Sequence, residues 1–267
     1  MFALSDADLR LRILGCADGP ASFNAEANRR GTVATSVDPL YRLDGRTIRD
    51  KITKTYDQIL EQTRRNTHQF VWDTIRSVDE LGRMRMDAMQ AFLEDYDLGK
   101  RQGRYVDAEL PLLAFPDKSF DLAVCSHFLF LYSEHLPEAF HRQAILELCR
   151  VATEVRIFPL LALDGRPSQY IASIVDDLSG SYEISLETVP YEFQRGANRM
   201  MRVRPGHKSG SGGCEPLSGL RAHDGQAVVT VRRIGNAKRT IVDRNDDFSP
   251  VETAEHRSTM QVSFSIV

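Results

Sequence analysis

Small residues and acidic residues gather in one short stretch near the N-terminus. Gly15, Ala17 and Gly19 follow a short apolar run. Asp38 ends a second apolar run, twenty-three positions after Gly15. Small residues let a ligand approach the backbone closely, and the first N–H groups of a following helix point toward it. A carboxylate at the end of the next strand can accept hydrogen bonds from both hydroxyls of a ribose. The stretch therefore predicts a site for a nucleoside-bearing cofactor.

The elements that would position these residues are a strand, a turn, a helix and a second strand. The apolar residues over 11–14 predict a buried strand, which glycine and proline end in a tight turn. Ser22 can cap a helix that runs to about residue 30, with Gly31 at its C-terminal stop. The β-branched stretch 32–37 predicts the second strand. The same pattern also fits a plain strand-to-helix turn that binds nothing.

Length and composition favour one α/β domain with an excursion or a tail. The chain has 267 residues, of which 42% are hydrophobic, and a net charge of −3. This charge gives no electrostatic footprint for nucleic acid and no polybasic membrane signal. No apolar run reaches the roughly 18 residues of a transmembrane helix, and we expect no signal peptide.

Four cysteines, Cys16, Cys125, Cys149 and Cys214, lie far apart and form no paired metal-binding spacing. Reduced thiols in a cytoplasmic protein are the simplest explanation, and we expect no metal site. Between residues 45 and 98, apolar residues recur at helical spacing, which predicts a helical insertion of two or three amphipathic helices. We hypothesise that the insertion caps a substrate cleft, with Phe70 and Trp72 facing the ligand.

A second informative segment follows the insertion. Tyr105 and Val106 read as a strand end, residues 107–119 as a loop with two prolines, and residues 120–126 as a buried strand. His127 follows that strand directly. Open α/β sheets bind ligands outside the carboxyl ends of their strands, so this position suits a functional side chain.

The two segments together resemble class I S-adenosylmethionine-dependent methyltransferases. The spacing Gly15-x-Ala17-x-Gly19 is similar to the first motif of that family, with alanine in place of the middle glycine and Ile13 where the family has an acidic residue. The second segment is similar to the family's central segment. In both, an acidic residue, here Asp107, is followed by a proline-containing loop and then by a Phe-Asp-Leu strand. The resemblance implies a Rossmann-like, doubly wound, seven-stranded, mostly parallel sheet with an antiparallel closing hairpin.

The resemblance also implies the cofactor S-adenosyl-L-methionine and a set of site residues. Asp107 would lie near the adenine amino group, and Ala108 near the adenine ring. Ser126 and His127 would face the methionine part and the methyl acceptor. The cofactor-binding residues are then Gly15, Cys16, Ala17, Asp18, Gly19, Asp38, Asp107, Ala108 and Ser126. His127 is the candidate base, because an imidazole titrates near neutral pH, and Tyr132 is a candidate for orienting the acceptor.

The resemblance runs on to residue 205 and is strongest to uncharacterised bacterial proteins described only as methyltransferase-like. Residues 1–205 form the expected methyltransferase-like domain. Residues 206–267 begin with a Gly/Ser-rich linker and hold only two aromatic residues, so we expect a largely disordered tail.

Three functions stay open. The first is methyl transfer to an unknown acceptor. Nucleic acid is disfavoured as acceptor because the chain has neither the Asn/Asp-Pro-Pro-Tyr/Phe motif nor a Pro-Cys nucleophile, which leaves a small molecule or a protein side chain. The second is a non-catalytic methyltransferase-like module that binds the cofactor. The third is an NAD(P)-dependent reductase, which the missing Gly-x-Gly-x-x-Gly spacing disfavours. The sequence does not indicate an oligomeric state.

Overall fold

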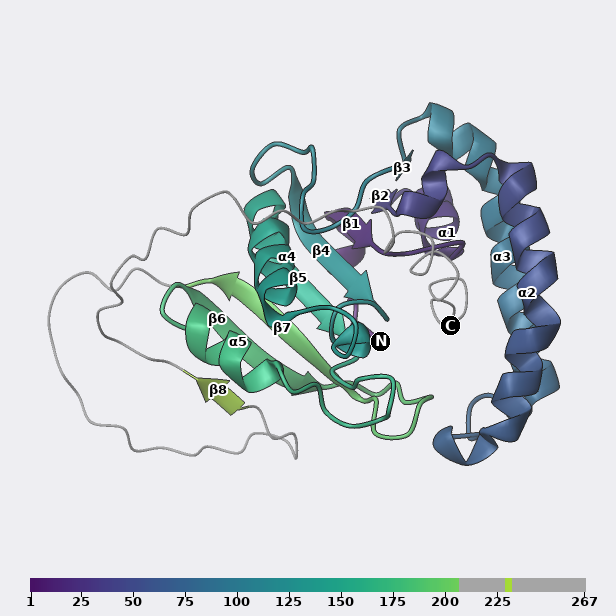
Figure 1. The fold of residues 1–267 in the computed structure, drawn as a ribbon. Helices are drawn as coiled ribbons and strands as arrows, with labels where there is room; N and C mark the ends of the chain where they lie inside the picture. The colour runs from purple at the N-terminus through teal and green to yellow at the C-terminus, as the bar shows by residue number, and fades with distance from the viewer. Residues whose placement is uncertain (207–228, 232–267) are drawn as a thin grey trace, which may run out of the picture.

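The computed structural model describes residues 1–206 and 229–231. Eight strands form one sheet (Figure 1). They are β1 (Arg12–Cys16), β2 (Val33–Val37), β3 (Tyr105–Val106), β4 (Phe120–Ser126), β5 (Ala152–Phe158), β6 (Tyr182–Thr188), β7 (Arg199–Pro205) and β8 (Val229–Val231). Their order in the sheet is β3-β2-β1-β4-β5-β7-β6-β8.

The pairing of these strands confirms the predicted fold class. Strands β1 to β5 pair in parallel, and β7 lies antiparallel between β5 and β6. The first seven strands therefore make a Rossmann-like, mostly parallel sheet that ends in an antiparallel hairpin. The short strand β8 pairs with the outer edge of β6, which adds an eighth strand to the seven expected. Otherwise, the predicted tail beyond residue 206 lies outside the described residues.

Helices cover both faces of the sheet. The α-helices are α1 (Phe23–Arg29), α2 (Gly45–Arg65), α3 (Val78–Arg101), α4 (Glu138–Val151) and α5 (Ile171–Leu178). Four short 3₁₀ helices join them: η1 (Asp8–Arg10), η2 (Pro39–Arg42), η3 (Thr67–Gln69) and η4 (Phe130–Tyr132). Helices α4 and α5 pack on one face through the main apolar core, and α1 and the N-terminal segment pack on the other. No helix among these described residues has the length and apolarity needed to cross a membrane.

The first helix begins and ends where the sequence predicts. Ser22 is its N-cap residue, but the Ser22 side chain makes no capping hydrogen bond, so the predicted cap is wrong in that detail. Gly31 follows the helix with a φ of +89°, a left-handed conformation that glycine adopts at little cost.

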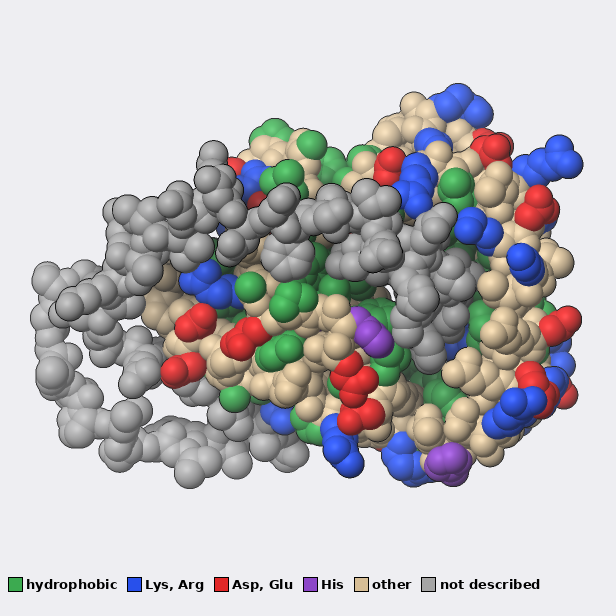
Figure 2. All heavy atoms as spheres, viewed as in Figure 1, with side chains coloured by type: hydrophobic (Ala, Val, Ile, Leu, Met, Phe, Trp, Pro, Cys, Tyr) green, Lys and Arg blue, Asp and Glu red, His purple; other side chains and the backbone are tan. Residues whose placement is uncertain are grey.

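Helices α2 and α3 form a long hairpin that stands beside the sheet (Figure 1). At its base, the Lys100 ammonium and the Tyr96 hydroxyl both donate hydrogen bonds to the carbonyls of Tyr41 and Leu43. These bonds fix the C-terminal end of α3 against the chain that follows β2. Figure 2 shows basic and acidic side chains interspersed over this hairpin, as expected for a solvated helix surface.

The tip of the hairpin is held as well. The Val71 N–H donates to the Phe193 carbonyl at 2.8 Å, and the Arg195 N–H donates to the Gln69 carbonyl at 2.8 Å. The rings of Phe70 and Trp72 pack against Phe193. The hypothesis that these two aromatic residues face a ligand is therefore wrong, because they fasten the tip to the loop between β6 and β7.

Candidate functional site

The turn after β1 has the compact shape that its small residues allow. Ala17 and Gly19 have φ values of +60° and +57°. A Cβ atom built on Gly15 would collide with the Asp18 carboxylate, so any larger residue there would displace that carboxylate from its present position. The Tyr41 hydroxyl donates to the Gly19 carbonyl at 2.7 Å and holds the turn against η2.

Asp38 joins this turn to the ends of β2 and β3. One carboxylate oxygen accepts the Gly19 N–H at 2.9 Å and the other accepts the Leu40 N–H at 2.8 Å. The Asp38 N–H in turn donates to the Val106 carbonyl, which places Asp107 close by. Burial raises the pKa of Asp38 to about 6, with a smaller contribution from the nearby carboxylates of Glu109 and Asp107. The structure thus brings together the carboxylates that the sequence predicts at these strand ends.

Asp18 turns back from the loop toward β2. Its carboxylate accepts a hydrogen bond from the Ser36 hydroxyl at 2.5 Å. Burial raises the pKa of Asp18 to about 7, and the neighbouring Asp38 carboxylate also contributes. Two carboxylates therefore share a small volume beneath the turn, and both resist ionisation.

This raised pKa makes stability depend on pH. Between about pH 4 and pH 7 the folded protein holds a proton on Asp18 that the unfolded chain releases, so stability falls as pH rises through this range. Asp18→Asn cannot ionise, and we expect its melting temperature to exceed that of the wild type by more at pH 8 than at pH 4.5. Thermal melts across this range test the prediction. Asp121→Asn, which loses an exposed ion pair with Arg12, is the control and should show no such gain. Parallel pH curves for Asp18→Asn and the wild type would contradict it.

A narrow slot lies beside the turn, where the resemblance places adenine. Cys16, Ala17, Ala108, Glu109 and Phe128 contribute to its walls, and its volume is about 20 Å³. Small-molecule sites in proteins have volumes of about 300 to 1,000 Å³. A purine base therefore requires the loop that carries Ala108 and Glu109 to move outward.

A larger cavity, of about 440 Å³, lies between α1, α3 and the N-terminal segment. Asp18 and Ser126 line it from the ends of the central strands, and Ala88 lines it from α3. Residues 1–4 form another wall. The sequence did not single out this N-terminal segment as part of the site. The cavity has the volume of a small-molecule site and two of the predicted cofactor residues in its walls.

A buried arginine holds the N-terminal segment in place. The side chain of Arg156, on β5, is only 2% exposed. Its guanidinium donates to the Asp8 carboxylate at 2.9 and 3.2 Å and to the Phe2 carbonyl at 2.9 Å. On its other side it donates to Glu154 at 2.6 Å. We call residues 1–8 the N-terminal strap, because these bonds fasten them across the face of the sheet.

His127 follows β4 in a left-handed conformation, with a φ of +49°. Its N–H donates to the Phe158 carbonyl at 2.7 Å, and its Nδ1 lies 2.6 Å from the Ser126 hydroxyl. Burial lowers the pKa of His127 to about 4, assisted by the positive charges of Arg85 and the N-terminal amine. The expectation that this imidazole titrates near neutral pH is therefore wrong. At neutral pH the ring is therefore uncharged, and one of its two nitrogens carries a lone pair that can accept a hydrogen bond.

Tyr132 lies away from these residues, in the core beneath α4. It is 6% exposed, and its hydroxyl has no hydrogen-bond partner among the described residues. It lines neither the slot nor the 440 Å³ cavity. The structure therefore does not place Tyr132 where it would orient an acceptor.

An unpaired buried hydroxyl lowers stability. We expect Tyr132→Phe to raise the free energy of unfolding by about 1 kcal/mol, because it removes the desolvation cost and keeps the ring. Urea denaturation measures this change. Tyr105→Phe is the matched control, since the Tyr105 hydroxyl donates to Asp95 at 2.9 Å and its loss should lower stability. A destabilised Tyr132→Phe protein would contradict the prediction.

The described part of the chain contains no metal-binding cluster of side chains. No group of three or more His, Cys, Asp or Glu side chains there is arranged to hold a metal ion.

Comparison with known proteins places the chain in a family. No model of a known protein family matches it. The uncharacterized protein MJ0045 of Methanocaldococcus jannaschii is 34% identical over 206 residues, which cover 76% of this chain and 90% of that protein. The chain belongs to the family of MJ0045. This relative is archaeal, so the predicted kinship with bacterial proteins is not confirmed.

Solved structures give more distant matches to this MJ0045 family member. The PH0226 protein from Pyrococcus horikoshii is 13% identical with a TM-score of 0.40, over 74% of this chain and 82% of that one. Magnesium protoporphyrin IX methyltransferase from Synechocystis, solved with bound SAH, is 14% identical with a TM-score of 0.41, over 75% and 77%. These are remote likenesses of shape, and they assign no ligand or substrate.

Proposed function

We propose that the protein binds S-adenosylmethionine and transfers its methyl group to an acceptor. The observation that carries this proposal is Asp38, whose carboxylate joins the glycine turn after β1 to the ends of β2 and β3. In this proposal Asp38 would receive the ribose hydroxyls, and Asp107 and Ala108 would receive the base, once the loop that carries Ala108 and Glu109 opens. Asp18 and Ser126 would face the methionine part, from the walls of the 440 Å³ cavity.

The bound cofactor supplies an activated methyl group on a sulfonium, so the protein has mainly to align the acceptor and exclude water. His127 is uncharged at neutral pH, but its lowered pKa makes it a weak base, so we propose that it positions the acceptor and receives a proton only from an acceptor that loses one readily. The cavity has the volume of a small-molecule site, which supports a small acceptor or a protein side chain rather than nucleic acid. The buried free thiols Cys16, Cys125 and Cys149 support a reducing location such as the cytoplasm.

Calorimetry with S-adenosylhomocysteine and with NADPH tests the proposal on the full chain. We expect saturable binding of S-adenosylhomocysteine and no binding of NADPH. Binding of NADPH alone would favour a reductase. The narrow slot gives some support to the alternative of a non-catalytic module. A screen of acceptors with radiolabelled S-adenosylmethionine tests this alternative. Methyl transfer by the wild type that is lost in His127→Ala would exclude it.

A further inference from the structure

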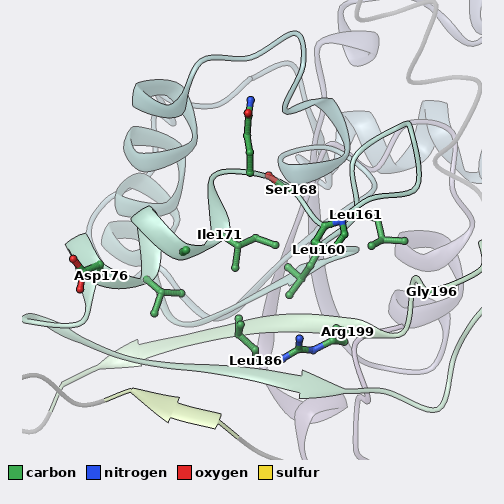
Figure 3. A pocket seen from close by; sticks show the side chains of 12 residues that line it. Leu160, Leu161, Ser168, Ile171, Asp176, Leu186, Gly196 and Arg199 are labelled. Carbon is green, nitrogen blue, oxygen red and sulfur yellow. The ribbon is translucent and has the colours of Figure 1, made fainter.

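A second cavity, of about 590 Å³, lies away from the glycine turn (Figure 3). Helix α5 forms one side, β6 and β7 form the floor, and the chain between β5 and α5 forms the remaining wall. Its residues are not those of the slot or of the 440 Å³ cavity, and nothing in the proposed methyl transfer uses it. It is therefore a separate candidate site.

The walls of this cavity are mainly apolar. Leu160, Leu161, Ile171, Val175 and Leu186 all contribute to them, and Figure 3 shows those that it labels converging on the hollow between α5 and the strands. The volume lies within the range of about 300 to 1,000 Å³ typical of small-molecule sites. An apolar hollow that opens to water favours a ligand with an apolar body, because binding removes that surface from water.

One basic side chain lines the cavity. Arg199, at the start of β7, lies on the floor beside Leu186 (Figure 3). Further along the same strand, Arg202 and Arg204 form ion pairs with Glu154. The Arg199 side chain, in contrast, makes no ion pair or hydrogen bond with any residue that the structure describes.

The acidic side chain in the lining does not complement Arg199. Asp176 lies toward the C-terminal end of α5, away from Arg199 (Figure 3). The end of the cavity near Arg199 therefore carries a positive charge beside an apolar surface. An anionic group on a ligand would supply the missing partner.

We propose that this cavity binds a small amphipathic carboxylate, with its apolar body between α5 and β6 and its carboxylate paired with Arg199. A guanidinium matches a carboxylate with two parallel hydrogen bonds, which gives this head group both strength and orientation. The apolar walls then select an aliphatic or aromatic body of moderate length over a small polar acid.

Two probes that differ only in charge test the head group. Octanoate and its neutral isostere octanamide are titrated calorimetrically into the full-length wild type and into Arg199→Gln. We expect the wild type to prefer octanoate by about tenfold, and Arg199→Gln to bind both probes equally. Arg166→Gln is the charge-matched control and should keep the preference, because Arg166 lies in the segment between β5 and α5 but its exposed side chain is not part of the cavity lining. Equal binding of both probes to the wild type, or a preference that survives in Arg199→Gln, would overturn the proposal.

A second variant tests the location. Ala172 lines the cavity from the exposed side of α5, so Ala172→Trp should fill the space without disturbing the core. We expect this variant to lose binding of both probes while its melting temperature stays near that of the wild type. Undiminished octanoate binding by folded Ala172→Trp, or the absence of octanoate binding by the wild type at millimolar concentrations, would also overturn the proposal.

Discussion

Asp38→Asn is expected to weaken the binding of S-adenosylhomocysteine by about 100-fold, which corresponds to about 3 kcal/mol. The substitution replaces one acceptor oxygen by an NH₂ group. Either the Gly19 or the Leu40 N–H then faces a donor, so one of the two bonds by which Asp38 joins the turn after β1 to η2 is lost. The same change removes the negative charge proposed to receive the ribose hydroxyls. Calorimetry on the folded variant measures the loss.

Two matched variants separate this effect from a general loss of carboxylates. Asp107→Asn removes the carboxylate proposed to lie near the adenine amino group, and we expect a smaller loss, of about tenfold. Asp121→Asn removes a partly exposed carboxylate that pairs with Arg12 and should leave affinity unchanged. If Asp38→Asn binds within threefold of the wild type, about 0.7 kcal/mol, the placement of the ribose at Asp38 is wrong.

Arg156→Met is expected to lower the free energy of unfolding by about 3 kcal/mol. Methionine keeps much of the volume of the side chain but removes its bonds to Asp8, Glu154 and the Phe2 carbonyl. Asp8 then lies against the face of the sheet without its cationic partner. Urea denaturation measures the change. Arg204→Met is the control: its pair with Glu154 is half exposed, so we expect a loss below about 1 kcal/mol.

The same variant should release the N-terminal strap. In Arg156→Met we expect faster amide hydrogen exchange over residues 2–8, while the amides of β2 keep their protection. Binding of S-adenosylhomocysteine should weaken as well, because residues 1–4 form a wall of the 440 Å³ cavity. If amide hydrogen exchange instead rises uniformly over the described residues, Arg156 stabilises the whole fold and does not specifically hold the N-terminal strap.

The local parts of the site could be predicted from the sequence, because their signals are short-range. Gly15 and Gly19 indicate a turn that needs small residues, and Asp38 ends a β-branched run. Parallel strands bring their carboxyl ends to one edge, so the proximity of Asp38 and Asp107 follows from the strand assignment.

The strap was missed because its bonds join residues far apart in the chain. Arg156 and Asp8 are separated by 148 positions, and no local pattern connects them. One signal was present: a charged residue between Val155 and Ile157, in a strand expected to be buried, indicates a buried ionic partner. The lowered pKa of His127 could not be predicted either, since it depends on burial and on Arg85, which approaches from α3.

The α2–α3 hairpin is fastened at its base through Lys100 and at its tip through Val71. A helix pair that is fixed at both ends is expected to be rigid and not to open and close as a lid. Ala88, on α3, is part of the wall of the 440 Å³ cavity, and we infer that the hairpin borders the path by which a bound molecule leaves. Weakening the tip should therefore speed the entry and the exit of a ligand by the same factor. The residence time would shorten while the dissociation constant stays the same.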